Sequence, residues 1–272
     1  MNTTFTEPAK KHLGQNFLHE RGVIDKIVQA VDPQPGDAIV EIGPGQGALT
    51  FPLLRKHGAL TAIEFDRDLH APLQAAARAH GTLRLIEGDV LGVDFTALAA
   101  EMAPAGGQIR LVGNLPYNLS SPILFHALDH AAAVRDMHFM LQKEVVERMA
   151  AGPGSKVYGR LSVMLQAYCA VTPLFIVPPG AFRPAPKVDS AVCVARQNSR
   201  ISPRICSAVT APLPKCSPFT ALQPNEDGGM TAQSMLASSG RAVRKVCTNL
   251  GGTSDDSREC ESDIGAVDVL RS

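Results

Sequence analysis

The chain has 272 residues, of which 45% are hydrophobic, and its 26 basic and 26 acidic residues cancel to a formal net charge of zero. This length suffices for one large domain and a smaller one, and no apolar run approaches the roughly 18–20 residues of a membrane-spanning helix. A dedicated nucleic-acid-binding protein is usually more basic, so any contact with nucleic acid has to come from local patches.

The N-terminus and the cysteines predict a cytoplasmic protein. The first residues contain no apolar signal-peptide core, so we expect a mature cytoplasmic chain. The six cysteines show neither a CxxC pair nor a Cys/His spacing typical of a metal site. We therefore expect free thiols and no bound metal.

The composition changes near residue 195. Residues 196–272 contain a single aromatic residue, Phe219, and they are dense in Ser, Pro and Cys with no regular apolar period. Such a segment buries too little apolar surface to offset the entropy lost on ordering it. We expect a folded domain over residues 1–195 and a disordered or damaged tail over residues 196–272, with a natural linker as the alternative.

Before that boundary, short apolar runs alternate with helical patterns. Five runs predict strands at residues 38–42, 60–65, 82–86, 109–112 and 137–141, and helical patterns lie around 48–57, 67–80, 121–132 and 143–151. The alternation predicts an α/β fold of the Rossmann-like kind, a mostly parallel sheet with helices on both faces. A ligand is then expected at the carboxyl ends of the strands.

The first loop at that edge is EIGPGQG, residues 41–47, whose glycines let the backbone approach a ligand closely. With Ala48 it also fits a dinucleotide fingerprint, so the loop alone does not choose the ligand. Glu41 would place a carboxylate beside the positive methionine part of S-adenosylmethionine, whereas it would repel a pyrophosphate. Glu64 can accept ribose hydroxyls and Asp89 the adenine amino group. Each acid alone is equally well a helix cap or a solvated residue; together they favour S-adenosylmethionine over NAD.

A second motif, Asn114-Leu115-Pro116-Tyr117, follows the fourth predicted strand. The amino nitrogen of adenine is a poor nucleophile because its lone pair is delocalised into the ring. The Asn114 side-chain oxygen and the Leu115 carbonyl can accept its two hydrogens and free the lone pair. Pro116 restricts Leu115 to extended geometry, and Tyr117 can stack on an extruded base. The motif predicts transfer to an adenine amino group, and an ordinary turn is the alternative.

The stretch PPGAFRPAPKVDSAV, residues 178–192, holds an aromatic residue between prolines. Phe182 is a candidate for the second face of a base sandwich, with a core position as the alternative. Basic side chains at positions 10, 11, 143, 148, 156, 160, 183 and 187 are candidates for contacts with RNA phosphates, although each alone is equally an ordinary surface charge.

Taken together, these residues resemble the KsgA/RsmA family of ribosomal RNA adenine dimethyltransferases. The resemblance covers about residues 8–193 and is carried by GQNFL at 14–18, EIGPGQGALT at 41–50, EFDRDL at 64–69, GNLPYNLSSPILF at 113–125, the stretch DMHFMLQKEV to YGRLSVM at 136–164, and residues 178–192. The segments at 136–164 are more specific than the glycine loop. They favour this family over the related methylases of large-subunit RNA.

The resemblance implies a function and a set of contacts. It implies S-adenosylmethionine-dependent dimethylation of the N6 groups of two adjacent adenosines in a hairpin near the 3′ end of 16S rRNA, within the small ribosomal subunit and as part of its biogenesis. It also implies a small helical C-terminal domain, and we expect a monomer. Carried over by position, the cofactor contacts are Asn16, Leu18, Gly43, Glu64, Asp89 and Asn114. The catalytic set is Asn114, Leu115, Pro116, Tyr117 and Phe182.

The sequence leaves the family pattern after about Val192, where a strand and a basic helical domain would follow. We interpret this departure as a shift of the reading frame near codon 193, which the nucleotide sequence read in the other frames would reveal. Two other functions stay open at this point. One is a ribosome-assembly factor that binds RNA with little or no catalysis, and the other is a different adenine-N6 methyltransferase.

Overall fold

The computed structural model describes residues 8–10, 13–104 and 106–198. The expectations for the tail, including the shifted frame and the absent helical domain, lie outside these residues. Seven helices are described: α1 (Arg21–Val31), α2 (Thr50–His57), α3 (Arg67–Ala77), α4 (Phe95–Met102), α5 (Ser120–Asp129), α6 (Lys143–Ala150) and α7 (Arg160–Tyr168). None of these described helices has both the length and the apolar character needed to cross a membrane.

The described strands form two sheets. The large sheet contains β2 (Ala38–Ile42), β3 (Ala59–Glu64), β4 (Thr82–Glu87), β5 (Ile109–Asn114), β6 (Val134–Gln142), β7 (Cys169–Val177) and β9 (Ser190–Gln197). The small sheet pairs β1 (Phe17–Leu18) with β8 (Phe182–Arg183). Short 3₁₀ turns, η2 (Val90–Gly92), η3 (Ala131–Ala133) and η4 (Pro179–Ala181), complete the described elements.

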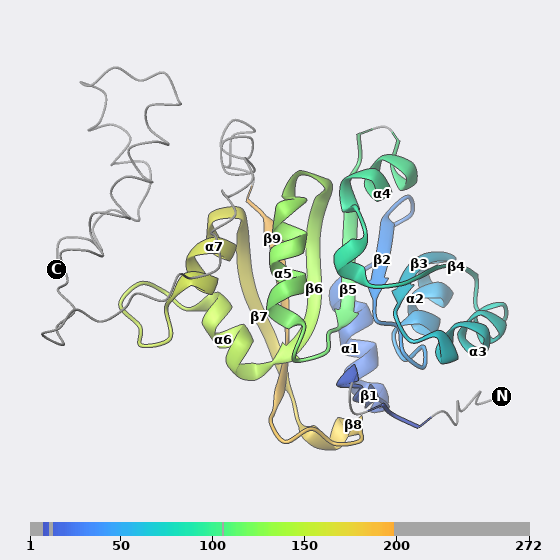
Figure 1. Ribbon diagram of the computed structural model, residues 1–272, viewed down its shortest axis with the longest axis horizontal. Helices are drawn as coiled ribbons and strands as arrows, with labels where there is room; N and C mark the ends of the chain where they lie inside the picture. Colours follow the sequence, from blue (N-terminus) through green and yellow to red (C-terminus); the bar gives the residue numbers. More distant parts are fainter. Residues whose placement is uncertain (1–7, 11–12, 105, 199–272) are drawn as a thin grey trace, which may run out of the picture. The chain divides into compact units, whose positions relative to one another are not determined.

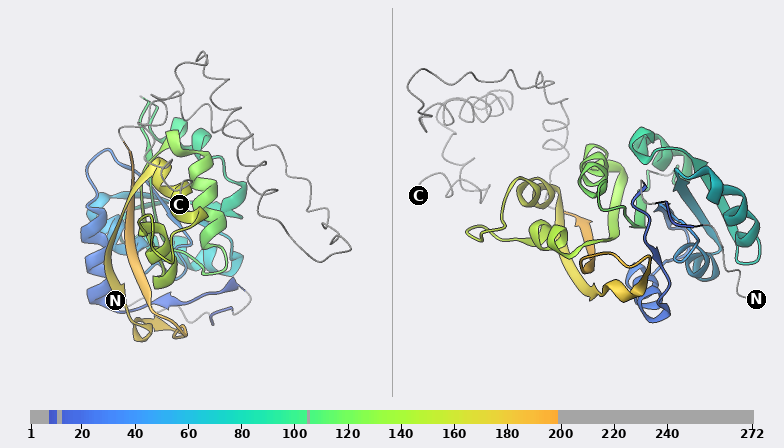
Figure 2. Two further views of the ribbon diagram at one scale, coloured as in Figure 1. Left: turned by 90° about the vertical axis from the view of Figure 1, so that its left-hand side faces the viewer. Right: turned by 60° about the horizontal axis from the view of Figure 1, so that its bottom comes forward.

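The large sheet has the strand order β4-β3-β2-β5-β6-β9-β7. Strands β4, β3, β2, β5 and β6 pair in parallel, and β9 runs antiparallel between β6 and β7. Helices lie on both faces of the sheet (Figures 1 and 2). The predicted α/β architecture is therefore confirmed. No α-helix lies between β7 and the antiparallel strand β9, whose connection contains only η4 and β8.

The centre of the sheet is apolar because helices cover it on both sides. All five residues of β2 are buried, as expected for a central parallel strand without polar alternation. Helix α3 begins where the Asp66 carboxylate accepts the Asp68 amide, and α4 begins where Asp94 accepts the amides of Thr96 and Ala97. These side chains cap the first turns of α3 and α4 and so mark where the two helices begin.

Strand β9 extends to Gln197, five residues beyond Val192. Cys193, where unrelated sequence was expected to begin, is 1% exposed and lies opposite Phe139 of β6 and Pro173 of β7. The sheet is therefore complete through this strand. The change in composition near residue 195 therefore falls among the last paired residues of β9.

A buried ion-pair cluster lies near the amino-terminal ends of the parallel strands, at the end of the sheet opposite the pocket. The Arg110 guanidinium lies 2.7 Å from the Asp37 carboxylate and 2.9 Å from that of Asp136. Hydrogen bonds and the charges of Arg110 and His138 lower the pKa of Asp136 to about 2, although burial alone acts in the opposite direction. This cluster joins the starts of β5 and β6 to the turn before β2.

Candidate active site

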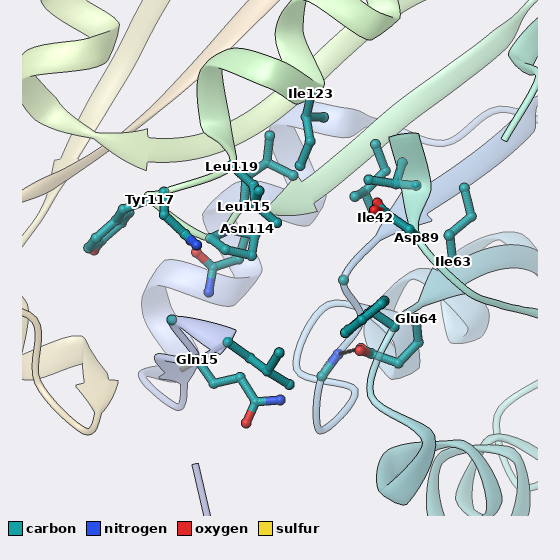
Figure 3. Close-up of a pocket in the computed structure, with 18 of the residues that line it drawn as sticks. Gln15, Ile42, Ile63, Glu64, Asp89, Asn114, Leu115, Tyr117, Leu119 and Ile123 are labelled. Atoms are coloured by element: carbon teal, nitrogen blue, oxygen red, sulfur yellow. Dashed lines mark hydrogen bonds between the residues drawn. The ribbon is translucent and has the colours of Figure 1, made fainter. Parts of the chain in front are cut away.

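A pocket opens where the parallel strands end. Five stretches of chain contribute to its wall, residues within 13–17, 42–45, 63–65, 88–90 and 114–123. Figure 3 shows Glu64 and Asp89 on one side of it and Asn114 and Tyr117 on the other. The strands β3, β4 and β5 thus bring Glu64 and Asp89, two of the three predicted acids, to the same pocket as the Asn114 motif.

The glycine loop forms the floor of the pocket beside the end of β3. The Gly43 amide donates to the Ile63 carbonyl at 2.9 Å, and the Gly45 amide donates to Glu64 Oε2 at 3.0 Å. Gly43 and Gly45 have φ values of 66° and 55°, which side chains other than glycine rarely adopt. A Cβ on Gly45 would also lie 3.2 Å from the Phe17 ring. The loop therefore needs glycine for its conformation and for its close contact with the N-terminal segment.

Glu64 is the acid best placed to bind a ligand. Its side chain is buried, and its two oxygens accept the Gly45 amide and, at 2.8 Å, the Asp66 amide. Burial raises the pKa of Glu64, while these two backbone bonds act to lower it. Each carboxylate oxygen can accept a second hydrogen bond, so a diol placed in the pocket can be held by both.

Asp89 follows β4 and is exposed at the rim of the pocket, where its Oδ1 accepts the Leu91 amide at 3.0 Å. Two apolar side chains, Phe65 and Val90, line the wall directly after Glu64 and Asp89. Phe65 is 60% exposed, unusually open for a phenylalanine. Phe65 and Val90 could have been predicted as pocket residues from the sequence, because each directly follows an acid at the end of a strand.

Glu41 is placed differently from the expectation. It is absent from the pocket wall, 2% exposed, and accepts the Thr50 hydroxyl of α2 at 2.7 Å. Burial, together with the nearby Glu64 charge, raises its pKa to about 8. The carboxyl group therefore lies beneath the glycine loop and ties it to α2, because the Glu41 side chain projects from β2 toward that helix.

The Asn114 side chain is oriented by the N-terminal segment. Its Nδ2 donates to the Asn16 carbonyl at 3.0 Å. A carbonyl oxygen can only accept, so the amide nitrogen must face Asn16 and the side-chain oxygen is turned away from it. The bond to Asn16 thereby leaves the side-chain oxygen as the acceptor of a residue that lines the pocket.

The remaining residues of the second motif continue the wall. The Leu115 amide donates to the Met140 carbonyl at 3.1 Å, which fixes the loop to β6. The Pro116 carbonyl accepts the Ser120 hydroxyl at 3.1 Å at the start of α5. Tyr117 is half-buried, and its hydroxyl lies 2.7 Å from Ser190 Oγ.

Leu18 and Phe182 do not line the pocket. They face each other across the small sheet, in register, and are 5% and 3% exposed. Both belong to the hydrophobic core cluster that also contains Val192. Each side chain packs into the core, as the alternative for Phe182 had it, because the pairing of β1 with β8 turns these apolar side chains inward. A contact of Leu18 with the cofactor and of Phe182 with the target base stays a prediction.

The N-terminal segment is fastened to the start of α3 by contacts that sequence reasoning missed. Lys10 Nζ lies 2.6 Å from Asp66 Oδ1 and 2.5 Å from Asp68 Oδ2, and Gln15 Nε2 donates to Asp66 Oδ2 at 2.8 Å. These bonds raise the pKa of Lys10 and lower that of Asp66. Lys10 was a candidate for phosphate contacts, but here it holds the segment that carries Asn16 against the pocket.

The two described cysteines, Cys169 and Cys193, are buried free thiols, and burial raises the pKa of each to about 12. Thiols in this state are unreactive. Among the residues that the structure describes, no group of three or more His, Cys, Asp or Glu side chains could hold a metal ion.

The strand order, the glycine loop and the acids at the strand ends define an S-adenosylmethionine-dependent methyltransferase of the Rossmann-like class. More narrowly, the family model for ribosomal RNA adenine dimethylases matches residues 6–203. The chain belongs to that family.

Individual relatives agree with this assignment. A ribosomal RNA small subunit methyltransferase A from Xanthomonas axonopodis pv. citri (strain 306) is 77% identical over 192 residues, which is 71% of each chain. Its namesake from Xanthomonas campestris pv. campestris (strain B100) is 72% identical over 209 residues, 77% of this chain and 76% of the relative.

Two solved structures share the fold. A dimethyladenosine transferase from Plasmodium falciparum superposes with a TM-score of 0.59 at 29% identity, covering 67% of this chain and 63% of the other. The 23S rRNA methyltransferase ErmE superposes with a TM-score of 0.60 at 26% identity, covering 71% and 77%.

The pocket residues fit S-adenosylmethionine, the cofactor of this class. Gly43 and Gly45 line the pocket without a Cβ. Glu64 offers two carboxylate oxygens to a ribose diol, and Asp89 offers an acceptor to an adenine amino group. Phe65 and Val90 supply the apolar surface that a base requires.

Proposed function

We propose that this chain transfers methyl groups from S-adenosylmethionine to the N6 atoms of two adjacent adenosines in a hairpin near the 3′ end of 16S rRNA. The observation that carries the proposal is the fixed orientation of Asn114, whose amide nitrogen is bound by the Asn16 carbonyl. An acceptor held at the end of β5, across the pocket from the acids that suit the cofactor, is the arrangement that activation of an amino group requires.

In the proposed reaction, the Asn114 oxygen and the Leu115 carbonyl accept the two hydrogens of the adenine amino group. These bonds draw the nitrogen toward a tetrahedral geometry, so that its lone pair is no longer shared with the ring. S-adenosylmethionine, when bound, supplies a methyl group on a positively charged sulfur that needs no further activation. Asn114 and Leu115 therefore act by alignment and electrostatics, without a strong general base.

Tyr117 is proposed to stack on the target base after it leaves its helix. Tyr117 is one of the residues that line the pocket, next to Pro116, and its hydroxyl is hydrogen-bonded to Ser190. Burial raises the pKa of Tyr117, so the phenol stays neutral at physiological pH and offers an uncharged aromatic face.

The choice of small-subunit RNA rests on the relatives, because those at 72–77% identity are named as methyltransferases of small-subunit ribosomal RNA. The similarity to the large-subunit enzyme ErmE is much lower, at 26%. We propose a monomer as the active form. A ribosomal substrate supports a cytoplasmic location.

We further propose that residues 1–195 form the catalytic domain and that residues 196–272 follow a shifted reading frame. The two relatives support this division, because their similarity covers only 71–77% of the chain. Reading the gene in the other two frames tests it, since one of them should encode a basic helical domain. Neither frame doing so would refute the shift.

The direct test is transfer of tritiated methyl groups to small subunits from a strain that lacks the modification. Incorporation into these subunits, with none into fully modified ones, supports the proposal. Incorporation only into large-subunit RNA would favour the other adenine-N6 methyltransferases. Tight binding to immature subunits without incorporation would favour an assembly factor.

A further inference from the structure

Ser190 joins the target-base motif to the sheet. Its Oγ lies 2.7 Å from the Tyr117 hydroxyl, although the two residues are 73 positions apart in the chain. The Ser190 side chain is fully buried at the first position of β9. There it is paired on one side with Gln142 of β6 and on the other with Val177 of β7. A residue held by strands on both sides is a rigid attachment point.

Tyr117, by contrast, lies in the loop between β5 and α5. Neighbouring bonds fix the backbone of this loop at Leu115 and Pro116, but they leave the direction of the Tyr117 ring undetermined. In Figure 3 the side chain extends beside Asn114, away from Glu64 and Asp89. The bond to Ser190 therefore fixes the far end of a ring whose near end borders the pocket.

The hydroxyls of Tyr117 and Ser190 are each other's hydrogen-bond partners. The Ser190 side chain is fully buried, and a buried hydroxyl without a partner is unfavourable. One donates and the other accepts, and the phenol keeps its proton because burial raises its pKa. The contact therefore supplies orientation to the ring without making either group a base.

We propose that Ser190 is a positioning residue of the methyl-transfer site, acting through its hydrogen bond to Tyr117 to set the angle at which that ring stacks on the target adenine. This inference rests on the proposed function. It explains why β9, which contains no residue of the pocket wall, begins with a fully buried hydroxyl that contacts Tyr117.

Ser190→Ala tests the proposal, and Ser162→Ala is its matched control. Ser162 is equally buried, and its hydroxyl is also hydrogen-bonded, but it lies on α7 and its partners are the backbone of Gly159 and Arg148. We expect Ser190→Ala to lower kcat for RNA methylation by about tenfold, since small errors in alignment are costly, with unchanged affinity for S-adenosylhomocysteine. Ser162→Ala should keep the parent kcat. Equal rates in the two variants would overturn the proposal.

Tyr117→Phe removes the same bond without changing the buried strand, so it decides the question if Ser190→Ala does not fold. The two single losses should not multiply, because a double variant removes one interaction only. A double variant whose loss equals the product of the single losses would overturn the proposal.

The chain has three tyrosines and no tryptophan, so ultraviolet titration can follow the phenols directly. The phenol titration that the parent shows and Tyr117→Phe lacks is that of Tyr117. In Ser190→Ala it should move to higher pH, because the bond to Ser190 acts to lower the pKa of Tyr117. An unmoved titration would refute the bond. A parent chain that binds S-adenosylhomocysteine but methylates no RNA would instead refute the proposed function, and the positioning role with it.

Discussion

Glu64→Ala should weaken binding of S-adenosylhomocysteine by about 10- to 150-fold. Hydrogen bonds to a charged group contribute about 1.5–3 kcal/mol, and about 1.4 kcal/mol corresponds to a tenfold change in Kd. The upper part of this range is favoured because the same carboxylate also holds the Gly45 amide at 3.0 Å and the Asp66 amide at 2.8 Å. Its loss removes a ligand contact and loosens the floor of the pocket.

Isothermal titration calorimetry with the parent, Glu64→Ala and Glu64→Gln measures this effect. Glu87→Ala is the matched control, since Glu87 lies directly opposite Glu64 in the β3–β4 register but does not line the pocket. Glu87→Ala should bind S-adenosylhomocysteine with the affinity of the parent. The affinity of Glu64→Gln should lie between those of the parent and Glu64→Ala, because glutamine retains one acceptor oxygen. The same affinity in Glu64→Ala and Glu87→Ala would refute the assignment of Glu64 as the ribose ligand.

Three further variants test other parts of the molecule. Asn114→Ala should lower single-turnover methyl transfer by about 10²-fold or more with little change in S-adenosylhomocysteine affinity, and a rate near that of the parent would exclude Asn114 from the chemistry. Burial raises the pKa of Glu41 from 4.5 to about 8, so the folded state binds more protons than the unfolded state in this window and the free energy of unfolding falls as pH rises through it. Denaturant titrations should show that Glu41→Gln flattens this slope, which is at most about 1.4 kcal/mol per pH unit, and equal slopes would contradict the burial argument. Asp136→Asn leaves Arg110 buried with only Asp37 as a close carboxylate, and should lower the free energy of unfolding by about 3 kcal/mol, whereas a loss below about 1 kcal/mol would show that the pair is dispensable.

Much of the sheet could be predicted because central parallel strands are continuous apolar runs. The runs at 38–42 and 82–86 match β2 and β4 to within one residue, and the other three match β3, β5 and β6 with shifted ends. Strand β7 was not predicted, since it lies at the edge of the sheet with a mostly exposed pattern and an irregular register between Pro173 and Phe175. Helices α1, α4 and α7 were also missed.

The site could be predicted where a residue's position along a strand fixes its place. Glu64, Asp89 and Asn114 follow from the rule that ligands bind at the carboxyl ends of parallel strands. Leu18 and Phe182 could not be placed, because only the pairing of β1 with β8 decides which way their side chains point. The contacts of Lys10 join segments more than fifty residues apart, and no local pattern encodes them.

The most direct test of the proposed reaction is mass spectrometry of nucleosides from small subunits that lack the modification, after incubation with this full chain and S-adenosylmethionine. N6,N6-dimethyladenosine should appear at two adjacent positions of the 3′ hairpin, and Asn114→Ala should leave them unmodified. A chain that binds S-adenosylhomocysteine yet produces no methylated adenosine at these positions would contradict the proposed function.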